Sequence, residues 1–588
     1  MTVSVDSVDV LVWGGGTGAV AAALQASRGG ASTLLLTPGS WLGGMVSAAG
    51  VCCPDGNELS PWQTGLWGAF LRELEQREPE GLDHNWVSCF GYRPATAEAI
   101  LQRWVDQENR LLWWPGCRLL EVERTDSLIT ALRVTVDGEK RTVKCRVAID
   151  GSDRGDLLPL ADAPFRLGWE PKEQWNEPSA PDRQRLSTDP FFRTQPVQSP
   201  TWVVMGQLRS DRLPDAPDRR AHPGGSPLPD PFRGACETFG LEKTITYGRL
   251  PSGLVMINWP LHGNDWHHGL ERAFLGDTSE EAALFTEMQS HSLSFTEELS
   301  KASDGWLELG HGFPSSAASP APWLAAMPYW REGRRMVGRT TVIEQDLLPR
   351  VEDASSTDPP VNDAGVLQSI AVGNYANDHH YPGDDWPLAP KSCRWGGRWT
   401  GTPFCIPFGA LLSDSIDNLL SADKAFSTSH MANGATRLQP LIMNIGQAAG
   451  AASALAVESN LQPTELTIRS VQDRLISDAM APSAVAPLWD TPWHHADWLE
   501  RQKAVLDRKH LDAARPQMPD SGKTLHAVVQ PDNQGGYTVH PKGGPPCQLI
   551  TLEPAVNDRL QGIETPTEVK LQGSHNPWGG WFRASSLR

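Results

Sequence analysis

The sequence lacks the cysteine pairs and the excess of basic residues that would indicate a metal site or a nucleic-acid partner. Its nine cysteines form no C-x-x-C pair, whereas a structural zinc site usually takes its ligands in pairs at about that spacing. Lys and Arg number 51 against 70 Asp and Glu, for a net charge of -19, and nucleic-acid binding needs clustered basic side chains. We therefore expect reduced thiols, no metal, no nucleic-acid partner and a small-molecule substrate, with the oligomeric state left open.

Long hydrophobic runs and the pattern of a signal peptide are also missing. No apolar run approaches the length of roughly 20 residues that spans a bilayer. Residues 1–9 contain no Lys or Arg and lead directly into an apolar run at 8–13, whereas a signal peptide places basic residues before its apolar segment. We expect a cytoplasmic protein without a membrane segment.

The first forty residues contain the pattern of a nucleotide-binding βαβ unit. A buried strand is predicted at 8–13, an Ala-rich helix follows it, and a second buried strand is predicted at 34–36. Gly14 and Gly16 take the first two positions of the motif G-x-G-x-x-G/A, and Ala19 takes the third. The N–H groups of such a turn and the dipole of its helix face a pyrophosphate. The pattern therefore predicts a bound dinucleotide cofactor.

The length and the changes in composition predict several domains. Single domains usually have about 100–200 residues, so 588 residues allow two or three. We predict an α/β fold in which a Rossmann-like nucleotide-binding domain is split by a mixed α+β substrate or cap domain and followed by a small β-rich C-terminal appendage. The predicted bounds are 1–170 and 396–460 for the two parts of the nucleotide-binding domain, 171–395 for the cap with loops at 171–200 and 211–231, 461–516 for a helical extension and 517–588 for the β-rich region.

Five further segments carry motifs in a fixed order. They are the turn 41–45 (WLGGM), the strand end 148–153 (AIDGSD) with its continuation to 168, the arginine segment 327–338 (MPYWREGRRMVG), the histidine segment 369–380 (SIAVGNYANDHH) and the C-terminal segments 406–411 and 417–456. Together they resemble the FAD-dependent oxidoreductases of the glutathione-reductase-like fold. The resemblance implies that FAD is the cofactor and that the split domain binds it.

The resemblance also implies which residues contact the cofactor. The implied FAD-binding residues are Gly14, Gly16, Thr17, Gly18, Ala19, Thr37, Gly43, Gly44, Met45, Asp150, Gly151, Ala422, Asp423 and Arg437. Two of them depart from the family pattern. Thr37 replaces the acidic residue that would hold the ribose hydroxyls, and Asp423 stands where the family has Gly. A carboxylate near the flavin would change its electronic properties.

Candidate catalytic residues come from the arginine and histidine segments. They are His380, His379, Arg334, Arg335 and His430, with Arg331 beside the two arginines and Arg437 as a rival from the C-terminal motif. The forked guanidinium of Arg334 or Arg335 can hold a carboxylate or an enolate-like oxygen. His380 can move a proton near neutral pH. We therefore expect Arg334 or Arg335 to share a pocket with His380.

These assignments predict an FAD-dependent oxidoreductase that transfers a hydride between flavin and a small organic substrate. Two alternatives stay open: a flavin-dependent C=C reductase or desaturase resembling fumarate-reductase-like enzymes, and a redox-inactive FAD-fold binding protein, which Thr37 and Asp423 would suit. Sugars, aromatic compounds and unsaturated acids are all compatible with a pocket lined by some of the 24 Trp. Because the resemblance ends near residue 456, we also expect a chain cut near Met518 to fold and bind FAD.

Overall fold

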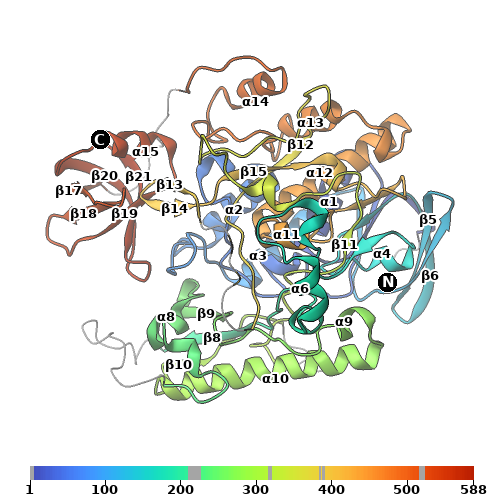
Figure 1. Ribbon diagram of the computed structural model, residues 1–588, viewed down its shortest axis with the longest axis horizontal. Helices are drawn as coiled ribbons and strands as arrows, with labels where there is room; N and C mark the ends of the chain where they lie inside the picture. Colours follow the sequence, from blue (N-terminus) through green and yellow to red (C-terminus); the bar gives the residue numbers. More distant parts are fainter. Residues whose placement is uncertain are drawn as a thin grey trace.

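Figure 1 shows the computed structural model of the protein. It describes residues 5–209, 227–314, 321–382, 386, 388, 391–514 and 524–588. Most of the loop predicted at 211–231 and the domain boundary predicted at 516/517 lie outside the described residues.

A mixed sheet of seven strands forms the centre of the α/β fold, and the predicted α/β class is confirmed. Its strands are β1 (Ser7–Trp13), β2 (Thr33–Leu36), β3 (Leu111–Trp114), β4 (Arg118–Thr125), β5 (Leu128–Val136), β6 (Glu139–Asp150) and β16 (Leu419–Ser421). The order is β3-β2-β1-β6-β5-β4, and β16 pairs with β6. Strands β3, β2, β1, β6 and β16 are parallel to one another, whereas β4, β5 and β6 form an antiparallel meander. Every residue of β2 is buried, as expected of a central parallel strand.

Two helices of small residues cross next to this sheet. They are α1 (Thr17–Arg28) and α12 (Gln439–Ser459). A Cβ added to Gly446 would lie 2.2 Å from the Gly18 carbonyl oxygen, and one added to Gly450 would lie 2.3 Å from the Ala22 oxygen. Glycine at these α12 positions therefore lets the two backbones touch.

Helix α12 also has the composition of a membrane span. Among the described residues it is the one helix that is long and apolar enough to cross a membrane. The apolar stretch of this helix is 89% buried inside the protein, as expected of a helix in the core of the fold. The other helices outside the middle layer include α2 (Gly65–Arg77), α3 (Pro94–Asp106), α4 (Leu157–Leu160), α11 (His430–Thr436), α13 (Ile468–Ile476) and α14 (Trp498–Leu506).

The middle of the chain builds a second layer around a three-stranded antiparallel sheet and a long helix, at the bottom of Figure 1. The strand order of the sheet is β10-β8-β9. The elements of the layer are β8 (Val204–Leu208), β9 (Leu254–Ile257), β10 (Leu307–Leu309), α8 (Gly240–Thr246), α9 (Arg272–Leu275) and α10 (Thr278–Ala302). Helix α10 begins with a capping box, in which Asp277 accepts from the Glu280 N–H and Glu280 accepts from the Asp277 N–H.

Several segments within the predicted cap interval return to the central body. Strand β12 (Ser369–Asn374) pairs with β15 (Pro403–Pro407) and contacts α12. Strand β11 (Arg335–Met336) pairs with β7 (Phe165–Arg166). The other short elements are α5 (Lys172–Trp175), α6 (Arg183–Thr188), α7 (Phe191–Thr194), β13 (Cys393–Trp395) and β14 (Arg398–Thr400).

A closed five-stranded barrel ends the chain. Its elements are β17 (Thr524–Pro531), β18 (Tyr537–Pro541), β19 (Cys547–Thr551), α15 (Pro554–Gln561), β20 (Thr567–Asn576) and β21 (Trp581–Leu587), and the strand order is β17-β18-β19-β21-β20. The barrel is not a free tail, because Ile550, Leu552 and Trp581 belong to the buried cluster of the main body. The Ser60 N–H also donates to the Leu552 oxygen at 2.9 Å. A cut near Met518 would therefore expose apolar surface of the main body. Folding and FAD binding by the shortened chain remain a prediction.

Candidate functional site

The predicted cofactor-binding segments meet at the carboxyl ends of the parallel strands. The glycine turn follows β1, Asp150 ends β6 with Gly151 directly after it, and Asp423 lies two residues after β16. Gly14 has a φ of 113°, and a Cβ there would lie 2.6 Å from the Gly151 backbone, so this position requires glycine. Ligands of open α/β sheets bind at this edge. The fold thus brings together segments that are more than 400 residues apart.

The WLGGM turn lies directly on the glycine turn. The Gly43 N–H donates to the Gly15 oxygen at 3.0 Å, and the Thr17 hydroxyl donates to the Gly43 oxygen at 2.7 Å. A Cβ on Gly44 would lie 2.8 Å from the Gly16 Cα. Met45, which follows, is 1% exposed. These contacts leave no layer of space between the two turns.

A side chain of the protein lies at the start of α1. The Gly18 N–H, in the first turn of the helix, donates to Asp423 Oδ2 at 2.9 Å. The Lys424 ammonium group lies beside Asp423 Oδ1 at 3.2 Å and also contacts Asp153. Burial opposes the charged ammonium, but the two carboxylates raise the pKa of Lys424 above its ordinary value. A buried cluster of two carboxylates and one cation therefore borders the glycine turn.

The hydroxyl of Thr37, where the family has a ribose-binding acid, is also engaged within the chain. It donates to the Gly39 oxygen at 2.7 Å and accepts from the Trp113 indole N–H at 2.9 Å. Thr37 is 0% exposed. The hydroxyl hydrogen and one of its two acceptor positions are thus already hydrogen-bonded within the protein.

FAD does not fit among these residues as the structure arranges them. A pyrophosphate needs unpaired N–H groups at the start of α1 and room above the glycine turn. The Gly18 N–H is bonded to Asp423, and Thr37, Asp150 and Asp423 are each 0% exposed, so no water-sized space borders them. The polar residues that face open space lie elsewhere, in a separate cavity.

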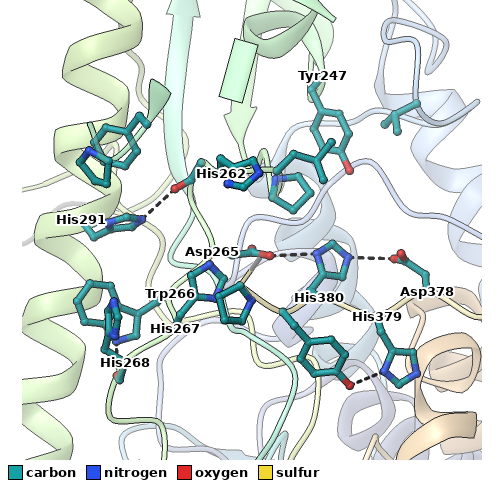
Figure 2. A pocket seen from close by; sticks show the side chains of 18 of the residues that line it. Tyr247, His262, Asp265, Trp266, His267, His268, His291, Asp378, His379 and His380 are labelled. Atoms are coloured by element: carbon teal, nitrogen blue, oxygen red, sulfur yellow. Dashed lines mark hydrogen bonds and ion pairs between the residues drawn. The ribbon is translucent and has the colours of Figure 1, made fainter. Parts of the chain in front are cut away.

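An open cavity of about 590 Å³ lies between the middle layer and the central body. Its walls come from the stretch after β9, from α10 and from the loop after β12 (Figure 2). The polar side chains that face it include Asp55, Tyr247, Asp265, Tyr375, Asp378 and His380. Burial raises the pKa of Asp55 to about 7. Among the described lining residues there is no Lys or Arg.

His380 lies between two carboxylates in this cavity (Figure 2). Its Nδ1 is 3.0 Å from Asp265 Oδ2, and its Nε2 is 3.0 Å from Asp378 Oδ2. The side chain of Asp265 is 3% exposed, whereas that of Asp378 is 42% exposed. The imidazole can donate from both nitrogens only when it is protonated. Buried Asp265 therefore orients the ring, and Nε2 faces Asp378, the more exposed of the two carboxylates.

Each of these carboxylates also forms an ion pair with an arginine. Arg331 Nη1 lies 3.0 Å from Asp265 Oδ1, and Arg437 Nη2 lies 3.1 Å from Asp378 Oδ2. Burial alone would raise the pKa of Asp265, but Arg331 and His380 hold it well below its ordinary value. Asp265 is thus a stable anion beside His380. Arg437, predicted as a cofactor contact, pairs with Asp378 at the cavity wall.

The structure does not place Arg334 or Arg335 in the pocket with His380. Arg334 donates to the backbone oxygens of Arg154 at 3.3 Å and Phe274 at 2.8 Å. Arg335 is 0% exposed and pairs with Glu170 at 2.8 Å. The shared pocket that we expected is therefore not formed by these two side chains, because both are already bound within the fold.

Asp265 is not among the residues predicted from the sequence, and Asp378 has no predicted role. Asp265 lies in a stretch dense in titratable and aromatic residues, Asn264-Asp265-Trp266-His267-His268. That density is a weak sign of a site. Asp265 and His380 are 115 residues apart, so only the tertiary structure shows that they are bonded.

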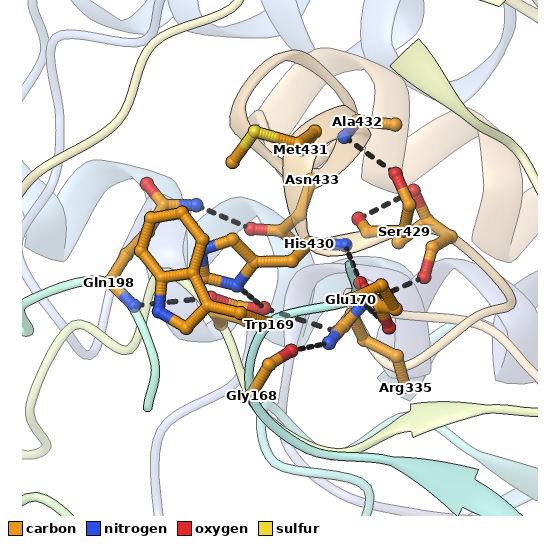
Figure 3. Close-up of polar contacts among 12 residues, drawn as sticks. Gly168, Trp169, Glu170, Gln198, Arg335, Ser429, His430, Met431, Ala432 and Asn433 are labelled. Atoms are coloured by element: carbon orange, nitrogen blue, oxygen red, sulfur yellow. Dashed lines mark hydrogen bonds and ion pairs between the residues drawn. The ribbon is translucent and has the colours of Figure 1, made fainter. Parts of the chain in front are cut away.

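A second, buried network contains His379 and His430 (Figure 3 shows its His430 end). His379 Nδ1 is 2.7 Å from the Tyr381 hydroxyl, which is 2.5 Å from His430 Nε2. His430 Nδ1 is 2.8 Å from Glu332 Oε1. Glu332 in turn lies 3.1 Å from Arg335 Nε. The chain of contacts thus joins a residue at the cavity wall to the buried Arg335.

The partners fix the direction of these hydrogen bonds. The Met431 carbonyl accepts from His379 Nε2 at 2.9 Å, so Nδ1 of the neutral ring accepts from the Tyr381 hydroxyl. Tyr381 then accepts from His430 Nε2, and His430 Nδ1 accepts from a protonated Glu332. Burial lowers the pKa of His379 to about 3 and that of His430 well below its ordinary value, and it raises the pKa of Glu332 to about 7. The pKa shifts and the geometry agree.

Glu332→Gln is expected to make the protein more stable than the wild type as pH rises. The folded-state pKa of Glu332, about 7, lies above its unfolded value. The contribution of this carboxyl group to the free energy of unfolding is therefore complete at low pH and is lost as pH rises through 7. Between about pH 5 and 7 the wild type should lose roughly 1.4 kcal/mol per pH unit relative to the variant, and the difference should level off above that. Urea unfolding at each pH measures this. The exposed control Glu237→Gln should show no such trend, and parallel curves for Glu332→Gln and the wild type would contradict the assignment.

Comparisons with known proteins show one family match. The family described as FAD dependent oxidoreductase matches residues 9–475. The comparison with curated proteins gave no match. Similar solved structures include CabE, an aromatic hydroxylase from angucycline biosynthesis (12% identity, 57% of this chain and 54% of that chain, TM-score 0.28). Others are the OxyS anhydrotetracycline hydroxylase from Streptomyces rimosus (16%, 36% and 39%, 0.23) and the flavin-dependent monooxygenase PieE in complex with FAD and substrate (16%, 35% and 36%, 0.22).

The chain spans only 36–54% of the length of those three structures. The family match covers most of the chain and agrees with the ordered motifs and the parallel sheet. It confirms the resemblance seen in the sequence, and FAD is the cofactor of this family. The chain belongs to the FAD dependent oxidoreductase family.

Proposed function

We propose that the chain is an enzyme that binds a small, neutral, hydroxylated molecule in the cavity and moves a proton to or from it through His380. The observation that carries this proposal is the placement of His380 in the cavity wall between Asp265 and Asp378, with Nε2 bonded to the more exposed carboxylate. Family membership supports an oxidoreductase reaction. In oxidation of an alcohol or reduction of a carbonyl or C=C bond, FAD would take or supply the hydride when bound. An acid-base group such as His380 would then move the accompanying proton in either direction.

The walls of the cavity favour hydroxyl groups over carboxylates in the substrate. Asp55 and Asp378 offer oxygen acceptors, and Tyr247 and Trp266 offer aromatic surface. Sugars and phenols suit such walls, because acceptors bind their hydroxyls and flat rings cover their apolar faces. An unsaturated acid would place its negative charge among these carboxylates. The alternative that resembles fumarate-reductase-like enzymes is therefore less well supported by this cavity.

A redox-inactive binding protein is the second candidate, favoured by the filled space around the glycine turn. The two candidates differ in turnover. A binding protein would retain its ligand but convert none of it, with or without added FAD. The absorption spectrum of the purified protein, which reports bound flavin, should be recorded with this comparison.

The test is a panel of sugars, phenols and unsaturated carboxylic acids, screened by thermal shift and then assayed for turnover with and without added FAD. We expect a sugar or phenol to stabilise the protein. His380→Gln should keep the binding of that compound and lower its turnover by about 10²–10⁴, the usual effect of losing a general acid or base. The control His311→Gln lies outside this cavity and should behave as the wild type. Preferential binding of the acids, or full turnover by His380→Gln, would refute the proposal.

A further inference from the structure

The start of α1 has the properties of an anion site, and the protein supplies the anion itself. The helix begins at Thr17 after Gly16, and no side chain of the turn caps it. Its first N–H groups and its dipole therefore attract negative charge from elsewhere. Asp423 Oδ2 accepts the Gly18 N–H at 2.9 Å. A carboxylate oxygen thus takes the kind of hydrogen bond that a phosphate oxygen would take.

The same carboxylate fills the space that the glycine turn keeps free of side chains. A Cβ added to Gly16 would lie 2.5 Å from Asp423 Oδ2. In the motif, the second glycine is there so that backbone can approach the pyrophosphate. Asp423 therefore uses the clearance that glycine provides, at the position where the family resemblance has Gly instead of Asp.

Neighbouring charges keep this carboxylate in place. Lys424 is 0% exposed and contacts both Asp423 and Asp153. A pyrophosphate would bring more negative charge beside two carboxylates that share one cation. On the adenosine side, the Thr37 hydroxyl is already bonded to Gly39 and Trp113. The polar groups predicted to bind the pyrophosphate and the ribose, at the start of α1 and at Thr37, are thus hydrogen-bonded within the protein.

We propose that Asp423 substitutes for the pyrophosphate of the cofactor, so that FAD binds only when this carboxylate leaves the start of α1. The wild-type chain then binds FAD more weakly than the fold would otherwise allow. This inference rests on contacts outside the cavity of His380, so it can hold or fail independently of the proposed function.

The test measures FAD and ADP binding to the full chain by calorimetry, together with the FAD content of the protein as purified. ADP carries the diphosphate without the flavin, so it reports the phosphate site alone. We expect the wild type to purify with much less than one FAD per chain. Asp423→Gly should bind FAD and ADP at least about tenfold more tightly than the wild type. Asp423→Asn keeps the size of the side chain and an acceptor for the Gly18 N–H but removes the charge, so it should lie between the two.

The control is Asp417→Gly, which removes a part-exposed carboxylate from the same stretch of chain and should leave both affinities unchanged. A wild-type protein that carries one tightly bound FAD per chain would overturn the proposal, as would equal affinities for Asp423→Gly and the wild type. If Asp423→Gly does not fold, Asp423→Asn decides, since unchanged affinities in that variant would also overturn it.

Discussion

Gly18→Ala is expected to lose at least about 4 kcal/mol of unfolding free energy or to fail to accumulate as folded protein, a loss confined to severe core changes. A Cβ at Gly18 would lie 1.6 Å from the Ala422 oxygen and 2.6 Å from its carbonyl carbon. Both atoms are backbone and cannot turn away. Ala422 is held in turn, because its N–H donates to the Asp150 oxygen at 2.8 Å. Soluble yield and urea unfolding followed by circular dichroism measure the effect.

Helix α1 cannot relieve this clash by shifting, since Gly446 of α12 touches Gly18 from another side. The matched control is Gly39→Ala, where a Cβ would have no heavy atom within 4 Å. That variant should stay within about 0.5 kcal/mol of the wild type, as surface changes usually do. Wild-type stability in Gly18→Ala would show that the close contact between α1 and the end of β16 is not present in solution.

Arg335→Met is expected to cost about 3–5 kcal/mol of unfolding free energy at pH 8, the usual loss when one partner of a buried ion pair is removed. Arg335 is 0% exposed and lies 2.8 Å from Glu170 and 3.1 Å from Glu332. Removing the guanidinium leaves both carboxylates without their cation. Because the pKa of Glu332 is about 7, this group is ionised at pH 8 but already protonated at pH 5, so the loss should be smaller at pH 5. Urea unfolding at both pH values measures the two losses.

Arg339→Met is the matched control for this experiment. Arg339 pairs with Asp417 at 3.2 Å, but the two side chains are 40% and 39% exposed. Exposed pairs contribute about 0–1 kcal/mol. Equal losses in the two variants, or a loss for Arg335→Met that does not change between pH 5 and pH 8, would contradict the buried network.

The local parts of the fold could be predicted from the sequence. The βαβ unit at 8–36 follows from two apolar runs, a glycine turn and an Ala-rich helix, all within one short stretch. The close-packing face of α12 follows from Gly446 and Gly450 at helical spacing. Short strand-like runs at 525–529, 548–551 and 568–571 also indicated three of the five C-terminal strands. Their closure into a barrel against the main body was not indicated, since it depends on contacts such as Ser60 with Leu552.

The candidate site shows the same division. His380 could be singled out because its segment resembles a family motif, but its partner Asp265 comes from another layer of the fold. The neighbouring arginines could not be told apart by sequence. Arg331 reaches Asp265, whereas Arg334 and Arg335 reach separate partners inside the protein. Which way each side chain points depends on the local backbone and on the groups packed around it.

By itself, the sequence determined the family, the α/β class and the position of the nucleotide-binding turn, because these depend on residues close together or on motifs in a fixed order. Only the tertiary structure decided what fills that turn and where an open cavity lies. Asp423 is more than 400 residues from Gly18, and its hydrogen bond to the start of α1 exists only because β16 pairs with β6 beside β1. Hydrogen bonds and burial depend on distances in space, and distances between remote segments are set by the packing of the whole chain.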